Sequence, residues 1–149
     1  MNTLPLHGRV ALVTGGARRT GRCIALALAQ AGADLAIHYH QSAAEAEAVV
    51  AEVEAMGRRA LAVGANLADA AATEAAFKAA AEHLGRLDIL VNNACGILWK
   101  RLEDTSAAEW QGAVEQTLHI TYHACQAVLP TMRSQGFGRI VSLIDVDAD

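Results

Sequence analysis

A glycine-rich segment near the amino terminus, residues 14–21, has the residue types that a phosphate-binding turn requires. Glycine is needed where a strand turns sharply into a helix and where a pyrophosphate approaches the backbone, and the start of a helix presents oriented N–H groups to an anion. The segment follows a β-branched apolar run and precedes a helical pattern, which is the context of a dinucleotide site, although a plain tight turn would also use these glycines. The candidate cofactor-binding residues in it are Gly15, Arg18, Arg19, Thr20 and Gly21.

The residues after the second apolar run bear on which dinucleotide would bind. Sites specific for NAD place an acidic residue near the end of the second strand to bind the ribose 2′-hydroxyl, and no Asp or Glu lies between Leu35 and Ala44. Arg19, His40 and Ser42 are instead suited to surround a 2′-phosphate, which needs a fixed positive charge and short hydrogen-bond donors. We therefore expect NADP(H) as the cofactor. Two simpler interpretations stay open, His40 as a solvated loop residue and Ser42 as a helix N-cap.

Short apolar runs alternate along the chain with alanine-rich stretches of helical periodicity. The runs are nearly continuously apolar, which is typical of strands buried on both faces of a parallel sheet. The five predicted strands are Arg9–Thr14, Asp34–Tyr39, Arg59–Ala65, Leu87–Asn92 and Gly138–Ile144. The four predicted helices run over Gly21–Ala31, from Ser42 to just before Gly57, from an Asp69 cap to about Leu84, and from Ser106 to about Ala127. Two of these helices begin with the spacing of a capping box, Ser42–Glu45 and Ser106–Glu109.

The alternation of strands and helices predicts an α/β fold. Right-handed crossovers place the strands in one parallel sheet with helices on both faces, and the expected strand order of this Rossmann-like, doubly wound sheet is 3-2-1-4-5. In that order a ligand crevice opens at the carboxyl ends of strands one and four, where the order reverses. No linker or internal repeat divides the chain, so residues 1–149 are predicted to form one dinucleotide-binding domain.

Three motifs resemble the short-chain dehydrogenase/reductase family over essentially the whole chain. The family's turn reads Thr-Gly-x-x-x-Gly-x-Gly, and Gly15 and Gly21 match its first and last glycines, while Arg19 stands in the middle position. Residues 92–95 read Asn-Asn-Ala-Cys where the family has Asn-Asn-Ala-Gly, and residues 138–141 open the fifth strand as they do in the family. The resemblance implies an NADP(H)-dependent oxidoreductase that transfers a hydride to a carbonyl or pterin-like imine carbon.

The resemblance also implies roles for residues outside the turn. Asn93 and Ala94 belong to the family's second motif and are expected to lie against the cofactor. Asn66 and Leu67 occupy the family's Asp-hydrophobic position, where a side chain meets the adenine ring. An amide can donate and accept hydrogen bonds there, and an ordinary turn residue is the alternative interpretation of Asn66.

Within the family, the nearest resemblance is to the pteridine reductases and their bacterial relatives. These enzymes have an arginine where Arg19 stands and a segment similar to residues 38–45 after the second strand. They also have an aspartate in place of the family's catalytic serine, and Asp145 falls at that position, which makes it the candidate catalytic residue unless it is an ordinary strand-end residue. Ile97, however, stands where these enzymes have an aromatic residue that stacks on the pterin, and Thr117 replaces the family's Asn in the long helix.

The family's proton donor is a Tyr activated by a Lys four residues later, because the ammonium group lowers the pKa of the phenol. These 149 residues contain no Tyr-x-x-x-Lys, since Tyr39 and Tyr122 are followed at that spacing by Ala43 and Gln126. We therefore expect the chain to be truncated relative to the full family fold, with its Tyr and Lys in sequence after residue 149. The alternatives are a catalytically silent nucleotide-binding or interaction module, or a truncated gene product.

The composition of the chain limits which binding partners and which cellular compartment we expect. Twelve Lys and Arg against 16 Asp and Glu give a net charge of −4, which makes nucleic acid an unexpected partner. Three cysteines in no CxxC pair favour a reducing cytoplasm, and no apolar stretch suits a membrane span. His119 and His123 share a helix face without a third ligand, so no metal site is expected. An apolar run at residues 140–144 in an edge strand predicts a homo-oligomer or a partner chain, in addition to a small-molecule substrate.

Overall fold

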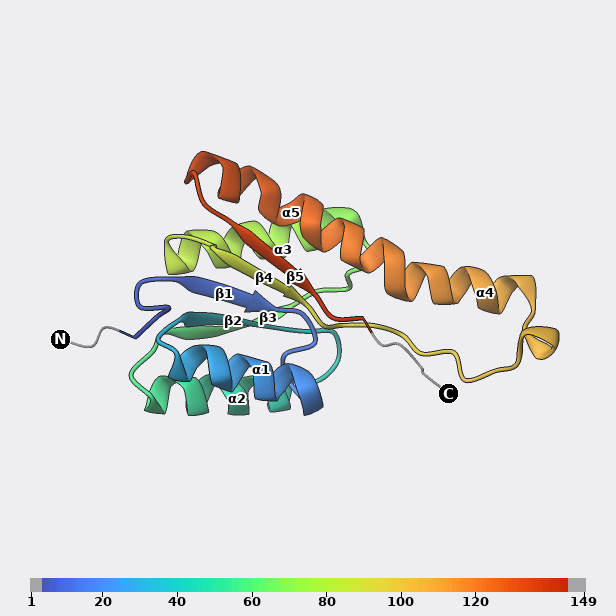
Figure 1. Ribbon diagram of the computed structural model, residues 1–149, viewed down its shortest axis with the longest axis horizontal. Helices are drawn as coiled ribbons and strands as arrows, with labels where there is room; N and C mark the ends of the chain where they lie inside the picture. The colour runs from blue at the N-terminus through green and yellow to red at the C-terminus, as the bar shows by residue number, and fades with distance from the viewer. Residues whose placement is uncertain (1–3, 145–149) are drawn as a thin grey trace.

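The structure, a computed structural model that describes residues 4–144, is a parallel sheet between two layers of helices (Figure 1). The strands are β1 (Val10–Val13), β2 (Asp34–Tyr39), β3 (Ala60–Gly64), β4 (Ile89–Asn92) and β5 (Arg139–Ser142). The α-helices are α1 (Arg19–Gln30), α2 (Ala43–Ala55), α3 (Ala70–Leu84), α4 (Ala107–Val114) and α5 (Ile120–Ser134). A short 3₁₀ turn, Leu102–Asp104, and a π-helical segment, Glu115–His119, complete the elements of this part of the chain.

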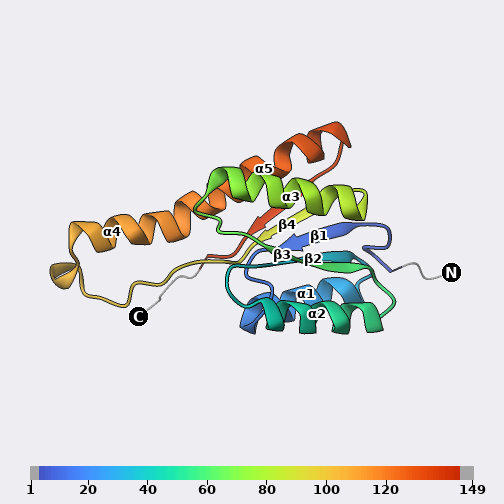
Figure 2. The same ribbon diagram turned by 180° about the vertical axis from the view of Figure 1, so that it is seen from behind.

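Neighbouring strands all pair in parallel, in the order β3-β2-β1-β4-β5. The α/β fold and the strand order predicted from the sequence are therefore confirmed. The helices α1 and α2 cover one face of the sheet, and α3 and α5 cover the other, as Figures 1 and 2 show from opposite sides. The order reverses between β1 and β4, so the carboxyl ends of these two strands flank the crevice expected for a ligand.

Every residue of β1 is buried, and alternate side chains enter opposite cores. Val10 and Leu12 join the apolar cluster that includes α3 and α5, whereas Ala11 and Val13 join the cluster that includes α1 and α2. This burial on both faces explains why the sequence of β1 is continuously apolar. The edge strand β5 departs from the expectation, because all four of its residues are exposed. Each large aliphatic side chain gains roughly 1.5–3 kcal/mol relative to exposure. The two cores thereby hold the central strands in place beneath the loops at their carboxyl ends.

The last helix differs most from its prediction. The sequence pattern predicts an end near Ala127, ahead of Pro130, but α5 continues to Ser134. Pro130 deprives the helix of one N–H donor, yet Met132 lies beyond it and is buried in the core, so the burial of this turn outweighs the lost bond. The helix α4, the π-helical segment and α5 form one long rod, and its first part projects beyond the sheet (Figures 1 and 2). No residue of α4 is buried.

The helix starts differ in which predicted caps they form. The Ser106 hydroxyl accepts the Glu109 N–H at 3.2 Å, and the Glu109 carboxylate accepts the Ser106 N–H at 2.9 Å, so this capping box is confirmed. Asp69 likewise caps α3 by accepting a backbone N–H of its first turn at 3.0 Å. The capping box predicted for Ser42–Glu45 is wrong, because the residue before α2 has φ −94° and ψ 57° and its side chain makes no cap hydrogen bond.

Candidate functional site

A cleft of about 560 Å³ lies between the glycine-rich turn after β1, the end of β2 and the loop after β4. Nine of the residues predicted to bind the cofactor line it, namely Gly15, Arg18, Arg19, Thr20, Gly21, His40, Ser42, Asn93 and Ala94. Five residues outside that predicted set also line it, namely Ala17, Tyr39, Gln41, Cys95 and Ile97. The parallel sheet brings these three segments together because it places the carboxyl ends of its strands along one edge.

Glycine is needed in the turn at two positions for different reasons. Gly15 has φ +61°, which is a left-handed conformation. This conformation is energetically unfavourable for any residue that has a side chain. Gly21 is buried at the start of α1, where a Cβ atom would collide with the Gly15 carbonyl oxygen and lie 2.7 Å from the Asn93 side-chain nitrogen. A side chain at residue 21 would therefore force apart the turn and the loop that form the cleft.

Arg19 stands where the resemblance expects a glycine, and it keeps the backbone conformation of a glycine. Its φ is +49°, and within residues 4–144 no other residue with a side chain has a positive φ. This conformation costs an L-residue roughly 1–2 kcal/mol. The side chain is exposed and lines the cleft, so the strained backbone places a guanidinium beside the space for a ligand.

The start of α1 has no capping side chain. Arg18 is the N-cap residue and makes no side-chain cap hydrogen bond, and the first turn of α1 contains no acidic residue. The helix begins at Arg19, two residues before the start that the sequence pattern predicts. The first N–H groups of a helix have no partner within it and attract anions, phosphate in particular. The turn therefore presents uncapped N–H groups next to two arginines.

Thr14 and Asn93 fasten the two sides of the cleft to each other. The Thr14 hydroxyl oxygen accepts the backbone N–H of Asn93 at 2.9 Å and that of Ala94 at 3.0 Å, and the hydroxyl donates to a β4 carbonyl at 3.3 Å. The Asn93 side-chain amide donates to the carbonyl oxygens of Thr14 at 3.0 Å and Gly15 at 3.3 Å. Asn93 thus holds the turn with its side-chain N–H groups while the residue also lines the cleft.

One corner of the cleft, between the turn and the start of α2, carries positive charge. Arg18, Arg19, His40 and Ser42, which the turn and the segment before α2 supply, all line the cleft. The Ser42 hydroxyl makes no cap hydrogen bond to α2 and can therefore bind a ligand. Glu45 on α2 places its carboxylate 4.0 Å from the Arg18 guanidinium, and both groups are largely exposed, so this contact contributes little. The corner has the charge and the donors that bind a phosphate monoester.

A second cleft, of about 470 Å³, adjoins the first and shares His40, Ala94 and Cys95 with it. Asn66 and Leu67, the residues predicted to meet the adenine ring, line this second cleft. The Asn66 side-chain oxygen also accepts a backbone N–H two residues on at 3.1 Å, so the turn role considered for this residue is present as well. All eleven predicted cofactor-binding residues therefore lie in two adjoining clefts.

His38 belongs to the site although the sequence motifs did not assign it a role. It lies in β2, is 2% exposed, and its ring contacts both the glycine-rich turn and the loop after β3. Burial lowers its pKa from 6.5 to about 4, while a hydrogen bond with the Ala65 carbonyl raises the pKa and the charge of His40 lowers it further. The signal that marks this residue in the sequence is a polar side chain within a continuously apolar strand.

A third cleft, of about 820 Å³, continues from the first along the loop after β4. Residues 95–101 form one side of it, and the exposed side chains of Ile97 and Trp99 belong to this loop. Leu143 and Ile144, just beyond β5, line it as well. The predominance of apolar side chains suits a substrate with an apolar portion.

The π-helical segment supports this third cleft. Thr117, which stands at the position of the family's Asn, lies in the segment and lines the cleft. The segment also holds the loop, because the Gly96 N–H donates to the Gln116 carbonyl oxygen at 2.8 Å. Segments of π-helix often occur at functional sites. Asp145, the candidate catalytic residue, lies outside the described residues.

Within residues 4–144, no three His, Cys, Asp or Glu side chains come close enough together to hold a metal ion. The rings of His119 and His123 are 6.3 Å apart, and Nδ1 of His123 lies 2.7 Å from the Leu67 carbonyl oxygen. None of the helices that the structure describes has both the length and the apolar character needed to cross a membrane.

Known proteins resemble the chain in both sequence and structure. Residues 9–147 match the family described as short chain dehydrogenase. A 3-oxoacyl-[acyl-carrier-protein] reductase of Synechocystis sp. is 40% identical over 147 residues, which cover 95% of this chain and 57% of that protein. A short chain dehydrogenase of Burkholderia cenocepacia, solved in complex with NADP, is 42% identical with a TM-score of 0.84, over 93% of this chain and 56% of that one.

A blue fluorescent protein from a metagenomic library, solved in complex with NADPH, is also similar. It is 36% identical with a TM-score of 0.82, and the match covers 93% of this chain and 56% of that chain. The present chain therefore spans a little over half the length of the relatives it matches.

Proposed function

Because the chain belongs to the short-chain dehydrogenase/reductase family, we propose that it is the NADP(H)-binding part of an oxidoreductase that transfers a hydride to a carbonyl or pterin-like imine carbon. The observation that carries this proposal is the positively charged corner of the first cleft, where two arginines and an uncommitted serine hydroxyl replace the acidic residue of an NAD site. The two similar structures solved with NADP or NADPH support the same cofactor.

The residues of the two clefts fit the parts of this dinucleotide. The uncapped start of α1 suits the pyrophosphate, and the missing side chain of Gly21 leaves the turn close to the loop after β4. Arg19 and Ser42 suit the 2′-phosphate. Asn66 and Leu67 in the second cleft suit the adenine ring. In these assignments the phosphate groups lie in the first cleft and the adenine ring lies in the second cleft, which adjoins it.

Bound NADPH supplies a hydride, which carries two electrons and one proton, and is oxidised to NADP⁺. The substrate carbon gains the hydride and its oxygen or nitrogen gains a proton, so the reaction also needs a proton donor. We propose that Asp145 orients the substrate or relays this proton. The donor itself is proposed to be a Tyr activated by a Lys four residues on, contributed by sequence outside these 149 residues.

The third cleft is the proposed substrate site. Its apolar lining from Ile97 and Trp99 suits a carbonyl compound with an apolar portion, and the name of the Synechocystis relative supports a carbonyl substrate. A pterin-like imine is the second candidate, because Arg19, residues 38–45 and Asp145 resemble pteridine reductases. Assays with a 3-oxoacyl thioester, a diketone and a quinonoid dihydropterin, each followed by the loss of NADPH absorbance, distinguish these substrates.

Nucleotide binding without turnover is the alternative function that we propose. Both functions predict that the chain binds NADPH. They differ in whether a complete enzyme containing this sequence oxidises NADPH with any of the substrates above. Turnover by the 149-residue chain alone would contradict both the silent module and the proposal that the proton donor lies elsewhere.

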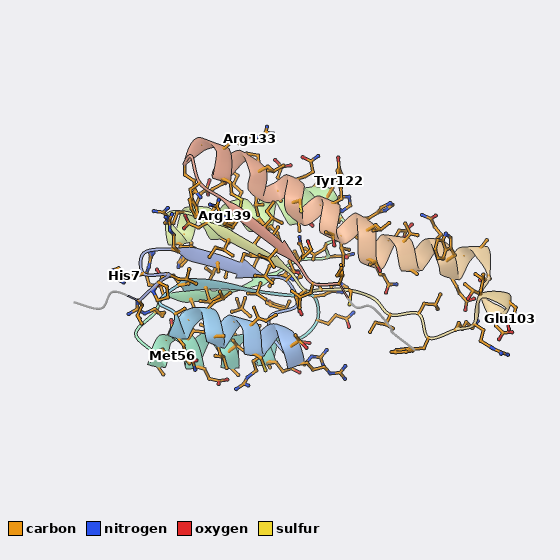
Figure 3. The ribbon with its side chains drawn as sticks, in the orientation of Figure 1. His7, Met56, Glu103, Tyr122, Arg133 and Arg139 are labelled. Carbon is orange, nitrogen blue, oxygen red and sulfur yellow. The ribbon has the colours of Figure 1, made fainter. Side chains whose placement is uncertain are left out.

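We also propose that the chain functions in the cytoplasm and that a second copy or another chain covers its exposed apolar surface. Ile140 and Val141 are exposed on the edge strand β5, and Trp110 and Tyr122 are exposed on the long helical rod. Figure 3 shows Tyr122 on the outer side of α5, away from the sheet. Edge strands and apolar side chains of this kind are typical of contacts between chains. Sedimentation of the purified chain tests for a second copy, and a monomer at micromolar concentration would contradict self-association and leave another chain as the partner.

Titration calorimetry with NADP⁺ and NAD⁺ tests the cofactor assignment. We expect NADP⁺ to bind at least roughly tenfold more tightly, because hydrogen bonds to a charged group contribute about 1.5–3 kcal/mol. Equal affinity for the two dinucleotides would overturn the assignment of the corner to the 2′-phosphate. Absence of binding by either dinucleotide would overturn the proposed function.

A further inference from the structure

His38 joins the two adjoining clefts through both nitrogens of its ring. Its Nδ1 lies 3.2 Å from the backbone nitrogen of Gly15 in the glycine-rich turn, and its Nε2 lies 3.1 Å from the carbonyl oxygen of Ala65, in the loop after β3. The backbone carbonyl of His38 also accepts the Gly16 N–H at 2.9 Å. One residue of β2 therefore holds two consecutive N–H groups of the turn and the residue that precedes Asn66.

The two partners of the ring determine its tautomer. A backbone N–H can only donate, so Nδ1 of His38 must be the unprotonated acceptor for Gly15. A carbonyl oxygen can only accept, so Nε2 must carry the proton that bonds to Ala65. The neutral ring with its proton on Nε2 makes both bonds. The charged ring carries a second proton on Nδ1, directed at the Gly15 N–H, and this bond is then lost.

The surroundings of the ring favour the neutral form. The ring is buried, and its edge-to-face neighbour is Phe77 of α3, with the ring centroids 6.1 Å apart. The contacts from the turn and from the loop after β3 are uncharged backbone groups. The titratable group that acts on the ring is His40, which directly follows β2 and whose charge also disfavours protonation of His38. Burial, the largest effect, holds the pKa at about 4, so the ring is neutral near pH 7.

We propose that His38 is a positioning residue that couples the phosphate-binding turn to the adenine-side loop, so that dinucleotide affinity depends on its neutral, Nε2-protonated form. The inference rests on the proposed binding of NADP(H) in these clefts. Asn93 supports the turn from the β4 side through its bonds to Thr14 and Gly15, and His38 supplies the support from the β2 side. The same ring holds the carbonyl that precedes Asn66, so the turn and the adenine-side loop keep a fixed spacing.

His123 contacts the same loop without this dependence on charge. Its Nδ1 lies 2.7 Å from the Leu67 carbonyl oxygen, so this nitrogen donates. A donating nitrogen keeps its proton in both the neutral and the charged ring, and protonation of His123 therefore leaves the bond intact. His38 differs because one of its two bonds requires an unprotonated nitrogen.

The test compares the wild-type chain with His38→Leu and with a control variant, His7→Gln. His7 is exposed and lies at the opposite end of the strands from the clefts, as Figure 3 shows. We expect His38→Leu to weaken NADP⁺ binding roughly tenfold near pH 7.5, at a temperature where circular dichroism shows the variant folded, and His7→Gln to bind as the wild type does. An unchanged dissociation constant in folded His38→Leu overturns the proposal.

The pH dependence separates positioning from a general loss of stability. The ratio of the dissociation constants of His38→Leu and the wild type cancels the titration of the cofactor's own phosphate. We expect this ratio to fall to roughly half its value as the pH falls from about 7 to about 4, because about half of the wild-type rings are charged where the pH equals the pKa. A ratio that stays constant over this range overturns the proposal. If His38→Leu does not fold, His38→Asn replaces it in the same comparison.

A measurement without cofactor distinguishes failure of this inference from failure of the proposed function. Nitrogen-15 NMR of the histidine rings reports which nitrogen of His38 carries the proton, and amide hydrogen exchange reports the protection of the Gly15 N–H. We expect an Nε2-protonated ring and faster exchange at Gly15 in the His38 variant. If the wild type does not bind NADP⁺, the proposed function fails, while these two signals still support or contradict the coupling of turn and loop.

Discussion

The side-chain oxygen of Thr14 accepts the backbone N–H of Asn93 at 2.9 Å, although 79 positions separate the two residues in the chain. The same oxygen accepts the Ala94 N–H at 3.0 Å. Thr14 follows β1 and Asn93 follows β4, so one hydroxyl group serves both walls of the cofactor cleft. The geometry of the cleft therefore depends on a bond that a single substitution can remove.

Thr14→Val keeps the branched shape of the side chain and removes this acceptor. We expect the free energy of unfolding to fall by about 2 kcal/mol, because two partly buried N–H groups lose their acceptor. NADP⁺ should also bind more weakly, since the two walls are no longer joined. Denaturant unfolding and titration calorimetry measure the two effects. Thr14→Ser keeps the oxygen and should therefore retain most of the stability and most of the affinity for NADP⁺. A valine variant as stable as the parent would contradict the assigned role.

Gly21→Ala tests the close approach of the turn to the start of α1. The added methyl group meets the Gly15 carbonyl oxygen, and we expect a loss of roughly 1–3 kcal/mol. Gly112 on α4 is the matched control, because no atom lies within 4 Å of the place its Cβ would occupy. Gly112→Ala should stabilise the chain by about 0.5–1 kcal/mol through helix propensity. Thermal unfolding measures whether each variant is less or more stable than the parent. Destabilisation by both variants would argue against a local collision at Gly21.

Arg19→Gly is expected to raise the stability of the chain and to lower its affinity for NADP⁺. Glycine adopts the left-handed conformation of residue 19 without strain, so the free energy of unfolding should rise by about 1 kcal/mol. Loss of the guanidinium should weaken NADP⁺ binding roughly tenfold and leave NAD⁺ binding unchanged. Arg19→Lys retains both the charge and the strained backbone, so it should keep more of the affinity for NADP⁺ and the stability of the parent. Equal loss of affinity for both dinucleotides would contradict a contact with the 2′-phosphate.

Acid should destabilise the chain through His38. The pKa of this residue falls from its ordinary value of 6.5 to about 4 on folding, so between these values the unfolded chain binds the proton more readily. The contribution of the neutral His38 ring to the free energy of unfolding is fully present above pH 6.5, declines as the pH falls, and is lost below about pH 4. Its size is roughly 3 kcal/mol. Urea unfolding of the wild type and of His38→Leu at a series of pH values measures it, and identical pH dependence in the two proteins would refute the assignment.

Asp88→Asn should lower stability without changing the cofactor site. The buried carboxylate accepts from Arg9 at 3.0 Å, from Arg86 at 2.6 Å and from the Val10 N–H at 2.9 Å. Burial raises the pKa of Asp88, but the hydrogen bonds, first that of Arg86, outweigh it and lower the pKa below its usual value. The variant removes the charge that accepts these three bonds, while the arginines themselves are partly exposed, so it should lose roughly 1–3 kcal/mol. Its dissociation constant for NADP⁺, measured on folded protein, should equal that of the wild type.

The position of the site was predictable because it follows from connectivity. A glycine-rich turn after the first strand and an Asn-Asn-Ala motif after the fourth must meet once the strands are parallel and the order reverses between them. The sequence therefore predicted nine residues of one cleft and two more that line only its neighbour. Local spacing was less reliable at Ser42, because the residue before α2 has a backbone conformation in which its side chain makes no cap hydrogen bond.

Other features depend on contacts between distant segments, which local patterns do not contain. The end of α5 depends on the burial of Met132, which outweighs the preference of Pro130 for a helix end. The role of His38 depends on partners 23 and 27 positions away, in the turn and in the loop after β3. A polar residue in an apolar strand marks the position, but its hydrogen bonds require the folded sheet.

The strand order also has a consequence for how the chain folds. β1, β2 and β3 are joined by short crossovers, whereas β4 pairs with β1 across the intervening two strands and three helices. Closing that longer loop costs more chain entropy, so we expect the β1–β3 half to assemble first and β4 to dock later. The phosphate-binding turn would then exist before its opposite wall does. During synthesis, the capacity to bind a dinucleotide should therefore appear in one late step, when Asn93 reaches Thr14.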